Sequence, residues 1–491
     1  MESGAFREKS SPPPRCDSDA APPRPVAVVG AGVTGLVAAY ALRRAGAPAT
    51  VYEASDRVGG VIRSVREGGY LAEFGPNSLL ETTTRLPVWL REIGLGERML
   101  YSDPAAENRY LVRYGRPVLL PASPLRLLFA CELFSWRAKL ALLREPFLRR
   151  GPADREESVA QFVLRRLNRE WLDYAINPMI AGIYAGDPER LSVRHGFPRL
   201  YNLEQKYGSL IRGQILGARE RRARGEIPKQ EAKKISFLDG LEELPRALAA
   251  SLGEATRLRS RVEELRRAEG GWEVFGTGPA GAFRARHSAV LLAAPAYRIA
   301  ELRLESEGAS EDLSLLGRIV YPPVASVVLG FRRDEVEHPL DGFGMLVPAK
   351  EPFSILGTLF SSSLFSGRAP KGFVTLTSYV GGTRAPELAL RPEGELAEMT
   401  VADLRRLLGV RGKPTFVHCA LYPKAIPQYE LGYGRFKELM DRVEARAPGV
   451  FFAGHYREGI SLSDSLQSGL RAAARIAAFL GKDPRGSGPA C

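Results

Sequence analysis

Three glycines near the start of the chain have the spacing that binds the phosphates of a dinucleotide. They are Gly30, Gly32 and Gly35 in the run VAVVGAGVTG, between an apolar β-branched segment and one rich in Ala and Leu. In such a strand–turn–helix, the glycines permit the tight turn, let the backbone approach the pyrophosphate and let the helix pack on the strand. Ala31, Val33 and Thr34 complete the predicted contacts, because backbone N–H groups at the helix start face the phosphates.

A carboxylate follows at the position where it would hold a ribose. Glu53 ends the predicted second strand, 18 residues after Gly35. A carboxylate there accepts hydrogen bonds from ribose hydroxyls, and its charge disfavours a 2′-phosphate. This spacing argues against NADP and leaves NAD and FAD as candidates.

The next residues distinguish FAD from NAD. Arg57, Gly59 and Gly60 follow in the run ASDRVGGVIRS. Adjacent glycines let the backbone lie against a bulky cofactor, and an arginine can neutralise pyrophosphate charge. This extension resembles the FAD signature of the flavin amine oxidase superfamily. The resemblance adds further predicted flavin contacts, at Ala54, Val61, Gly75, Pro76, Asn77, Ser78 and Val262.

A glycine-bounded turn near the C-terminus supports the same cofactor. In FFAGHYREGISLSDSLQSG, Gly454 and Gly459 surround a turn that opens onto a predicted helix. Backbone N–H groups at such a helix start would stabilise the anion of a reduced flavin. The expected contacts are His455, Ile460, Ser461 and Leu462, with a backbone contact and no acid–base role expected for the histidine.

The elements that would position these residues alternate between strands and helices. Strands are predicted at 26–29 and 49–54, a helical pattern from about 85 to 215, and a charged surface loop near 212–234. Strand-like segments return at 257–265, 271–276, 288–296, 324–331, 354–360 and 373–380, and a last strand ends near 452. A sheet that begins at 26 and is completed near 452 implies an α/β domain built from distant pieces, with another domain inserted.

The composition of the chain argues against several classes of protein and of binding site. The chain is 45% hydrophobic with a formal charge of +13, and its four cysteines lie far apart. We therefore expect no disulfide framework and no metal site, and a cytoplasmic location. No nucleic-acid-binding pattern is present. Residues 1–24 have no apolar core of a secretory signal and predict a disordered lead-in, and no apolar run reaches the roughly 18 residues of a spanning helix.

Several runs in the middle of the chain resemble the protoporphyrinogen oxidase family of that superfamily. They include EESVAQFVLRRL (156–167), NPMIAGIYAGDPERLSV (177–193), DGFGMLVP (341–348) and IPQY (426–429), and the similarity extends from about 26 to 480. The resemblance implies a Rossmann-like FAD-binding domain of the p-hydroxybenzoate hydroxylase type, an inserted mixed-sheet substrate domain and a helical membrane-binding domain. The implied boundaries are 25–90, 235–300 and 440–480 for the FAD-binding domain, 91–215 for the helical domain with part of the substrate domain, and 301–430 for the substrate domain.

The resemblance also implies a reaction. Family members remove six electrons from protoporphyrinogen IX in three rounds, forming protoporphyrin IX for haem synthesis, while dioxygen reoxidises the flavin and is released as hydrogen peroxide. Coproporphyrinogen III, with four carboxylates, is an alternative substrate that a more basic rim would favour and that the positive charge of the chain leaves open. Another amine oxidase-type reaction, or a flavin-binding scaffold without turnover, is a further alternative.

The family's substrate contacts map onto five positions of this sequence. Arg109 matches the arginine that pairs with a propionate, and Leu346 and Leu356 match apolar residues that sandwich the tetrapyrrole. Tyr379 stands where family members commonly have phenylalanine, and Gly182 would let the backbone approach a ring. No side chain is assigned as a catalytic base, because a hydride leaves a meso carbon for the flavin and the protein chiefly positions the substrate.

The segment 118–150 combines leucines, phenylalanines and Trp136 with an excess of arginines. Such a segment can lie in a membrane interface without spanning it, which predicts peripheral contact at the inner face of the cell membrane. The alternative is a pair of amphipathic helices packed on their own domain. The sequence leaves open whether the protein forms a homodimer.

Overall fold

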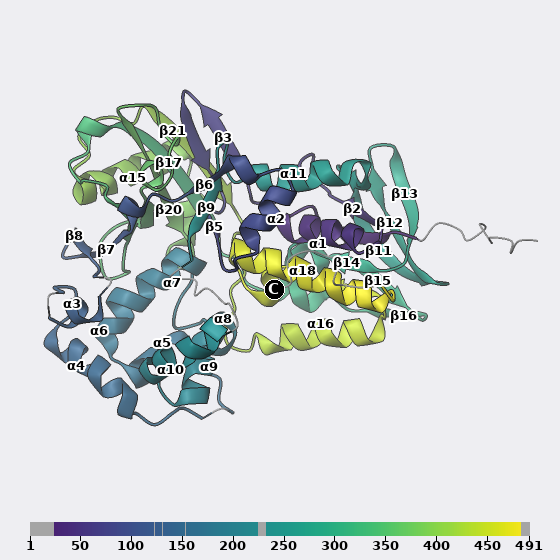
Figure 1. The fold of residues 1–491 in the computed structure, drawn as a ribbon, viewed down its shortest axis with the longest axis horizontal. Helices are drawn as coiled ribbons and strands as arrows, with labels where there is room; N and C mark the ends of the chain where they lie inside the picture. The colour runs from purple at the N-terminus through teal and green to yellow at the C-terminus, as the bar shows by residue number, and fades with distance from the viewer. Residues whose placement is uncertain (1–23, 122, 130, 153, 224–231, 483–491) are drawn as a thin grey trace, which may run out of the picture.

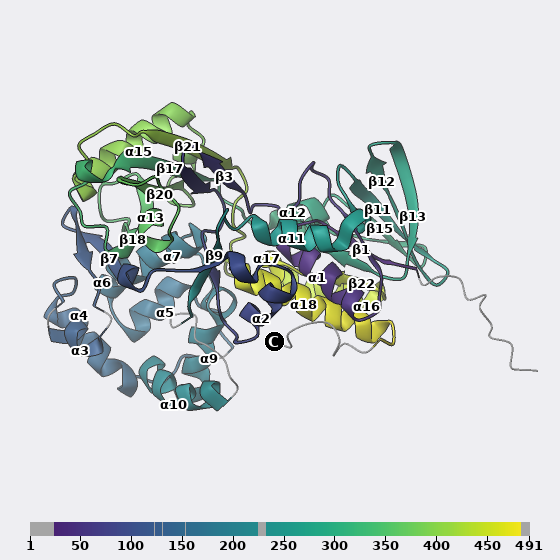
Figure 2. The ribbon, with the colours of Figure 1, turned by 45° about the horizontal axis from the view of Figure 1, so that its top comes forward.

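The computed structural model describes residues 24–121, 123–129, 131–152, 154–223 and 232–482. The predicted disordered lead-in therefore lies outside the described residues, apart from residue 24. The elements form three groups: a parallel sheet with its helices, a mixed sheet, and a cluster of helices (Figure 1). A second view shows the parallel sheet at one end of the molecule and the other two groups at the opposite end (Figure 2).

The parallel sheet gathers strands from distant parts of the chain. Its order is β10-β2-β1-β14-β22, and every neighbouring pair is parallel. The strands are β10 (Thr256–Arg257), β2 (Ala49–Tyr52), β1 (Val26–Val29), β14 (Val290–Leu292) and β22 (Val450–Phe452). The prediction of one sheet that starts at 26 and is completed near 452 is confirmed.

Helices and a second sheet cover the two faces of this parallel sheet. One core joins it to α1 (Val33–Arg44), α11 (Glu243–Leu252) and α18 (Leu462–Phe479). The other core contains α16 (Gly434–Arg446) and a five-stranded sheet of order β13-β12-β11-β15-β16. Its strands are β11 (Arg261–Ala268), β12 (Gly271–Gly278), β13 (Gly281–His287), β15 (Arg303–Ser306) and β16 (Ala309–Glu311). Residues 303–311 therefore belong with this sheet, and not with the mixed sheet that the boundary at 301 had predicted.

The mixed sheet has seven strands in the order β21-β17-β20-β19-β18-β7-β8. They are β7 (Asn108–Arg113), β8 (Arg116–Leu119), β17 (Val324–Arg332), β18 (Gly342–Leu346), β19 (Ile355–Leu359), β20 (Phe373–Gly381) and β21 (Phe416–Tyr422). Helix α15 (Glu393–Leu408) packs on it through a shared apolar core. The helical pattern expected from about 85 to 215 is thus wrong at 108–119, where Tyr114 and Gly115, both with positive φ, form a hairpin turn between β7 and β8.

The helical group spans residues 124–223. It contains α3 (Pro124–Phe129), α4 (Trp136–Arg144), η3 (Glu145–Phe147), α5 (Val159–Arg166), α6 (Arg169–Trp171), α7 (Asn177–Tyr184), α8 (Val193–Gly196), α9 (Pro198–Tyr207) and α10 (Leu210–Ala223). The predicted loop at 212–234 is wrong as far as residue 223, because Leu, Ala, Arg and Glu favour a helix there. Within the described chain, no helix is long and apolar enough to cross a membrane.

Small sheets and single helices connect the three groups. The two small sheets consist of β3 (Ser64–Glu67) with β4 (Tyr70–Glu73), and of β5 (Leu79–Leu80), β9 (Lys234–Phe237) and β6 (Met99–Tyr101). The short helices include α2 (Leu86–Glu92), α12 (Ala296–Ile299), η6 (Ser314–Arg318), α13 (Ser361–Leu364), α14 (Pro386–Ala389) and α17 (His455–Glu458). Cys131 and Cys419 are free thiols, whereas Cys16 and Cys491 lie outside the described residues.

Candidate active site

The turn between β1 and α1 has room for a ligand only on its outer side. Gly30 has a φ of +107°, and a Cβ at this position would lie 3.0 Å from the backbone nitrogen of Ala294. A Cβ on Gly35 would collide with the carbonyl oxygen of Gly30, so the start of α1 packs directly on the turn. Gly32, in contrast, has open space where a Cβ would stand. The backbone N–H groups at the start of α1 are therefore accessible to a phosphate.

Glu53 lies beside this turn, at the end of β2. Its Oε2 accepts a hydrogen bond of 2.8 Å from the backbone nitrogen of Ala31, and its Oε1 accepts one of 2.8 Å from the backbone nitrogen of Ser55. These bonds fix the carboxylate next to the glycine turn while the side chain stays partly exposed. The predicted ribose contact of Glu53 therefore has the required position. Val262 lies in the adjoining segment, where the backbone nitrogen of Ser260 bonds the Glu53 carbonyl oxygen at 2.7 Å.

The second glycine pair packs onto the first motif. The backbone nitrogen of Gly59 donates to the carbonyl oxygen of Ala31 at 2.8 Å, and Gly60 lies next to the Cα of Gly32. Arg57 donates to the carbonyl oxygens of Gly60, at 2.6 Å, and Ile62, at 3.1 Å. Arg57 thus holds the shape of this loop, in addition to the pyrophosphate contact predicted for it. Residues 75–78 lie against the same loop, because a Cβ on Gly75 would collide with the carbonyl oxygen of Val61.

The C-terminal turn approaches the same place from α18. The Thr34 hydroxyl donates to the carbonyl oxygen of Ser465 at 3.0 Å, and Gly469 lies against the backbone of Thr34. Ser461 caps α18 in a reciprocal pair with Asp464. Ile460 packs between the core behind the parallel sheet and the core of the helical group. Two predicted flavin motifs from opposite ends of the chain therefore meet through α1 and α18.

His455 follows Gly454 in this turn and is held by tyrosines. Its carbonyl oxygen accepts a hydrogen bond of 2.5 Å from the Tyr429 hydroxyl, and its Nε2 lies 3.4 Å from the Tyr321 hydroxyl. Burial lowers the pKa of His455 to about 4. The imidazole is therefore neutral at physiological pH and a weak base, and the backbone contact of His455 with the flavin stays a prediction.

The predicted substrate residues of the mixed sheet lie side by side. Leu346 on β18 pairs with Gly357 on β19, which in turn pairs with Tyr379 on β20. Gly182 on α7 faces this row, since a Cβ there would lie 2.6 Å from the Cδ2 of Leu346. Leu356 is 2% exposed and packs in a small core with residues of α7, against which Tyr379 also packs. Four of the five predicted substrate residues therefore meet where α7 crosses the sheet.

A hydrogen bond links this row to the predicted flavin segment. Asn77 donates through Nδ2 to the hydroxyl oxygen of Tyr379. Burial raises the pKa of Tyr379, so the hydroxyl remains protonated. The hydroxyl that distinguishes Tyr379 from the phenylalanine common in the family thus has a partner, and that partner belongs to the flavin segment.

Arg109 is the fifth predicted substrate residue and lies on β7, between β18 and the edge strand β8. It pairs with Gly344 on β18, and the pair formed by Leu111 and Leu346 lies two residues further along the same two strands, on the same face. Its side chain is exposed, and no ion pair with a carboxylate is found for it among the described residues. This exposure leaves the guanidinium available to an incoming anion.

Sequence reasoning missed a second cation beside Arg109. The Nζ of Lys234, on β9, lies 5.3 Å from the ring centroid of Phe343, which adjoins the Arg109 partner Gly344. Burial lowers the pKa of Lys234, and the nearby charge of Arg109 lowers it further. Lys234 was overlooked because it ends the charged run near 212–234, which was assigned as a loop. The strand-like ISF that follows Lys234 was a usable signal.

Arg384 was also missed. Its Nη2 donates to the carbonyl oxygen of Val347 at 2.9 Å and to the Oδ1 of Asn177 at 3.3 Å, so it ties the start of α7 to the end of β18. Its Nη1 is buried without a hydrogen-bond partner in the described chain, and burial lowers its pKa to about 10. Arg384 therefore positions α7, and Gly182 with it, over the sheet.

Comparison with known proteins agrees with this geometry. Residues 33–477 match the family described as flavin containing amine oxidoreductase. The chain belongs to that family. It is 37% identical to the mitochondrial protoporphyrinogen oxidase of Nicotiana tabacum over 93% of this chain and 95% of the relative. It is 26% identical to the coproporphyrinogen III oxidase of Bacillus subtilis over 93% of this chain and 98% of that one.

A solved structure supports the fold. A protein from Exiguobacterium superposes with a TM-score of 0.77 at 24% identity, covering 93% of this chain and 99% of that one. The expected Rossmann-like flavin fold is confirmed, and FAD, not NAD, is the cofactor of this enzyme. The open backbone at Gly32, the fixed carboxylate of Glu53 and the start of α18 provide a cradle that fits FAD.

Proposed function

We propose that the enzyme oxidises protoporphyrinogen IX to protoporphyrin IX in haem biosynthesis. The tobacco relative carries that name and matches this chain over almost all of its length. The observation that carries the proposal is the hydrogen bond between Asn77 and Tyr379, which joins the flavin segment to the row of residues facing Gly182. A flat apolar ring placed in this row would lie against the flavin, with its carboxylates toward Arg109.

In this reaction the protein would chiefly position the substrate against the flavin. Bound FAD would accept two electrons in each of three rounds and pass them to dioxygen, which leaves as hydrogen peroxide. Leu346, Tyr379 and the Gly182 backbone would hold the ring, and Arg109 would hold a propionate. The neutral imidazole of His455 would contribute no proton, so the N–H groups at the start of α18 would stabilise the negative charge near the cofactor.

One assay tests the proposal. The purified FAD-loaded enzyme is mixed with protoporphyrinogen IX in air, and porphyrin fluorescence and oxygen consumption are recorded together. We expect three molecules of oxygen consumed and three of hydrogen peroxide formed for each porphyrin, because six electrons leave in pairs. A yellow protein that forms no porphyrin above the rate of the uncatalysed reaction would contradict it.

Coproporphyrinogen III is a second candidate substrate, favoured by the two neighbouring cations Arg109 and Lys234. Arg109 and Lys234 lie at one rim, and the Bacillus subtilis relative is named for this substrate. A charge-assisted hydrogen bond contributes about 1.5–3 kcal/mol, so two cations can select a substrate with more carboxylates. The comparison of kcat/KM for the two porphyrinogens, in the wild type and in Lys234→Met, decides between them. A Lys234→Met variant that loses activity on coproporphyrinogen alone would favour that substrate.

We further propose a cytoplasmic enzyme with peripheral contact at the inner face of the cell membrane. The support is a set of exposed apolar side chains in the helical group, on α3, α4, η3 and α10: Phe129, Trp136, Leu140, Leu143, Phe147, Ile215 and Leu216. An apolar face of this kind can enter a membrane interface without spanning it. Sedimentation of the FAD-loaded enzyme with anionic liposomes at low salt tests this contact, and complete recovery in the supernatant would contradict it.

A further inference from the structure

The helical group has a basic surface pocket that the proposed reaction does not use. The pocket has a volume of about 560 Å³ and lies between η3 and the start of α10. Phe147, Arg149, Arg150 and Arg212 contribute to its lining, and no carboxylate is among the lining residues. A pocket with three arginines and no carboxylate is suited to an anion.

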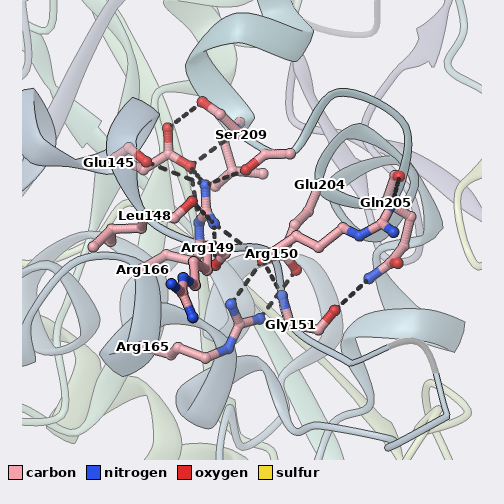
Figure 3. Close-up of polar contacts among 12 residues, drawn as sticks. Glu145, Leu148, Arg149, Arg150, Gly151, Arg165, Arg166, Glu204, Gln205 and Ser209 are labelled. Atoms are coloured by element: carbon pink, nitrogen blue, oxygen red, sulfur yellow. Dashed lines mark hydrogen bonds and ion pairs between the residues drawn. The ribbon is translucent and has the colours of Figure 1, made fainter.

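A buried network of charges fixes the backbone of this pocket (Figure 3). We call Glu145, Arg165, Arg166 and Glu204 the ion network. The Arg166 side chain is fully buried and donates to the Glu145 carboxylate, with its Nε at 2.9 Å. It also donates to the carbonyl oxygens of Arg149, at 3.1 Å, and Gly208, at 3.0 Å. One guanidinium therefore holds the backbone of both walls of the pocket.

The two glutamates of the ion network bind further backbone groups around the pocket, at the start of α10 and at Gly151. Glu145 accepts hydrogen bonds from the Ser209 hydroxyl at 2.6 Å and from the backbone nitrogen of Leu210 at 2.9 Å, where α10 begins. Burial opposes the ionisation of Glu145, but these hydrogen bonds bring its pKa below the ordinary value. Glu204 accepts from the backbone nitrogen of Gly151 at 3.0 Å. The ends of the segment 145–151 are thus fixed from inside, and its arginine side chains project outward.

The outward cations have no acidic partner. Arg149 and Arg212 are exposed, and neither makes an ion pair within the described chain. The Arg212 guanidinium lies 5.9 Å from the ring centroid of Phe147, which is itself 80% exposed. Arg150 donates to the carbonyl oxygen of Gln205 at 3.1 Å and makes no ion pair with a carboxylate within the described residues.

Exposed apolar side chains lie on the two helices next to the pocket in the chain, α4, which ends where η3 begins, and α10. On α4, Trp136 is 69% exposed and Leu143 is 55% exposed. On α10, Ile215 is 68% exposed and Leu216 is 54% exposed. Cations framed by exposed aromatic and aliphatic groups match the boundary of an anionic bilayer, where phosphates lie just above the acyl chains. A free phosphate ion would bind the arginines but would make no contact with the exposed apolar side chains.

We propose that this pocket binds the phosphate of an anionic phospholipid at a bilayer surface, with Phe147 and the exposed side chains of α4 and α10 at the acyl boundary. This inference rests on the peripheral membrane contact proposed above and adds the residues and the lipid charge that would select the membrane. Arg149 and Arg212 carry the charge recognition, and Phe147 carries the apolar contact.

The test uses the full-length, FAD-loaded enzyme with vesicles of phosphatidylcholine, with and without phosphatidylglycerol. The double variant Arg149→Gln/Arg212→Gln is compared with Arg318→Gln/Arg442→Gln, which removes the same charge from exposed positions in the group of the parallel sheet. We expect the first to bind phosphatidylglycerol vesicles roughly 30-fold more weakly than the wild type, and the second to bind nearly as the wild type does, because screening confines the effect of a charge to about 10 Å.

Four outcomes separate the possible sources of failure. Equal loss in the two double variants would overturn the pocket while leaving membrane contact standing, and a wild type that binds no vesicle would overturn both. Inorganic phosphate that displaces the enzyme from vesicles at concentrations too low to change the ionic strength would overturn the lipid assignment. Phe147→Ser should weaken vesicle binding without changing flavin absorbance or turnover in detergent, and unchanged vesicle binding would contradict the apolar contact.

Discussion

The ion network and the glycine turns predicted to bind the flavin are both held in a fixed shape, but by different parts of the chain. At the turns, the backbone of Gly30, Gly32 and Gly35 provides the shape, and Glu53 is the main charged side chain. In the ion network, the side chains of Arg166, Glu145 and Glu204 bind backbone groups far from them in the sequence. A site made by the backbone needs particular residues at fixed spacing, whereas a site made by long side chains does not.

The largest effect is expected where a side chain is forced into the backbone site. Gly35→Val would place atoms against the carbonyl oxygen of Gly30, which cannot move without breaking the turn. We expect no FAD-loaded protein, measured as the absence of flavin absorbance after purification. Gly394→Ala, on α15 with open space around it, is the control and should change stability by about 1 kcal/mol at most. A Gly35→Val protein that keeps its flavin would show that α1 does not need to pack on the turn.

Removing the central cation of the ion network is expected to have the next largest effect. Arg166→Met leaves Glu145 buried without a cation and leaves Glu204 with Arg165 alone, and should lower the free energy of unfolding by about 3–5 kcal/mol. Denaturant titration measures it. The control is Arg169→Met, whose pair with Asp173 at 3.0 Å is exposed on the arginine side and should cost about 0.5 kcal/mol or less. Equal losses of unfolding free energy in the two variants would mean that the ion network does not stabilise the backbone of the pocket.

Glu73 is a buried carboxylate next to the predicted flavin segment, and its ionisation should change the free energy of unfolding. Burial raises the pKa of Glu73 to about 7, against the ordinary 4.5, although Arg368 lies 3.7 Å away. Because the folded state binds this proton more tightly, the stability it contributes is present below pH 4.5 and is lost as the pH rises through 7.

Glu73→Gln should abolish this loss of stability at rising pH, because glutamine does not ionise. Relative to the variant, the wild type should lose about 3 kcal/mol of unfolding free energy between pH 4.5 and 7, measured by denaturant titration across that range. Exposed Glu97→Gln serves as the control and should keep the pH dependence of the wild type. Parallel curves for wild type and Glu73→Gln would show that Glu73 stays ionised throughout.

The smallest effect is expected at the contact between the flavin segment and the substrate row. Tyr379→Phe removes the hydroxyl that accepts from Asn77 and keeps the ring. We expect a loss of about 1 kcal/mol in stability and a change in kcat/KM of about threefold or less. Steady-state assays with protoporphyrinogen IX measure the second quantity. A loss of tenfold or more would mean that the hydroxyl takes part in substrate positioning beyond this bond.

The same contrast explains what the sequence could predict. The glycine spacing, Glu53 and the C-terminal turn were readable because each needs a particular backbone conformation, and the structure brings them together through α1 and α18. The role of Arg384 could not be predicted, and that of Lys234 had only the strand-like ISF after it as a signal, because a long side chain reaches its partners from any position that the fold brings near. The roles of Arg109 and Leu346 came only from family resemblance and stay predictions, although the sheet register places them on one face.

Errors in the predicted elements have a similar origin. The helical pattern assigned to 108–119 overlooked a hairpin whose turn depends on the positive φ of Tyr114 and Gly115. The loop assigned to 212–234 treated arginines as a sign of disorder, although α10 begins where Glu145, some 65 positions earlier, accepts from its first N–H groups. Local composition could not show a cap supplied from so far away.

The order in which the chain is made gives the parallel sheet a consequence for its synthesis. Strand β1 leaves the ribosome long before β22 and α18, which follow it after a delay on the order of a minute. Until then the cradle lacks its second wall, and the cofactor cannot be fully enclosed. Cofactor capture therefore depends on the synthesis of α18: a chain that stops short of α18 should remain colourless and become a substrate for proteolysis.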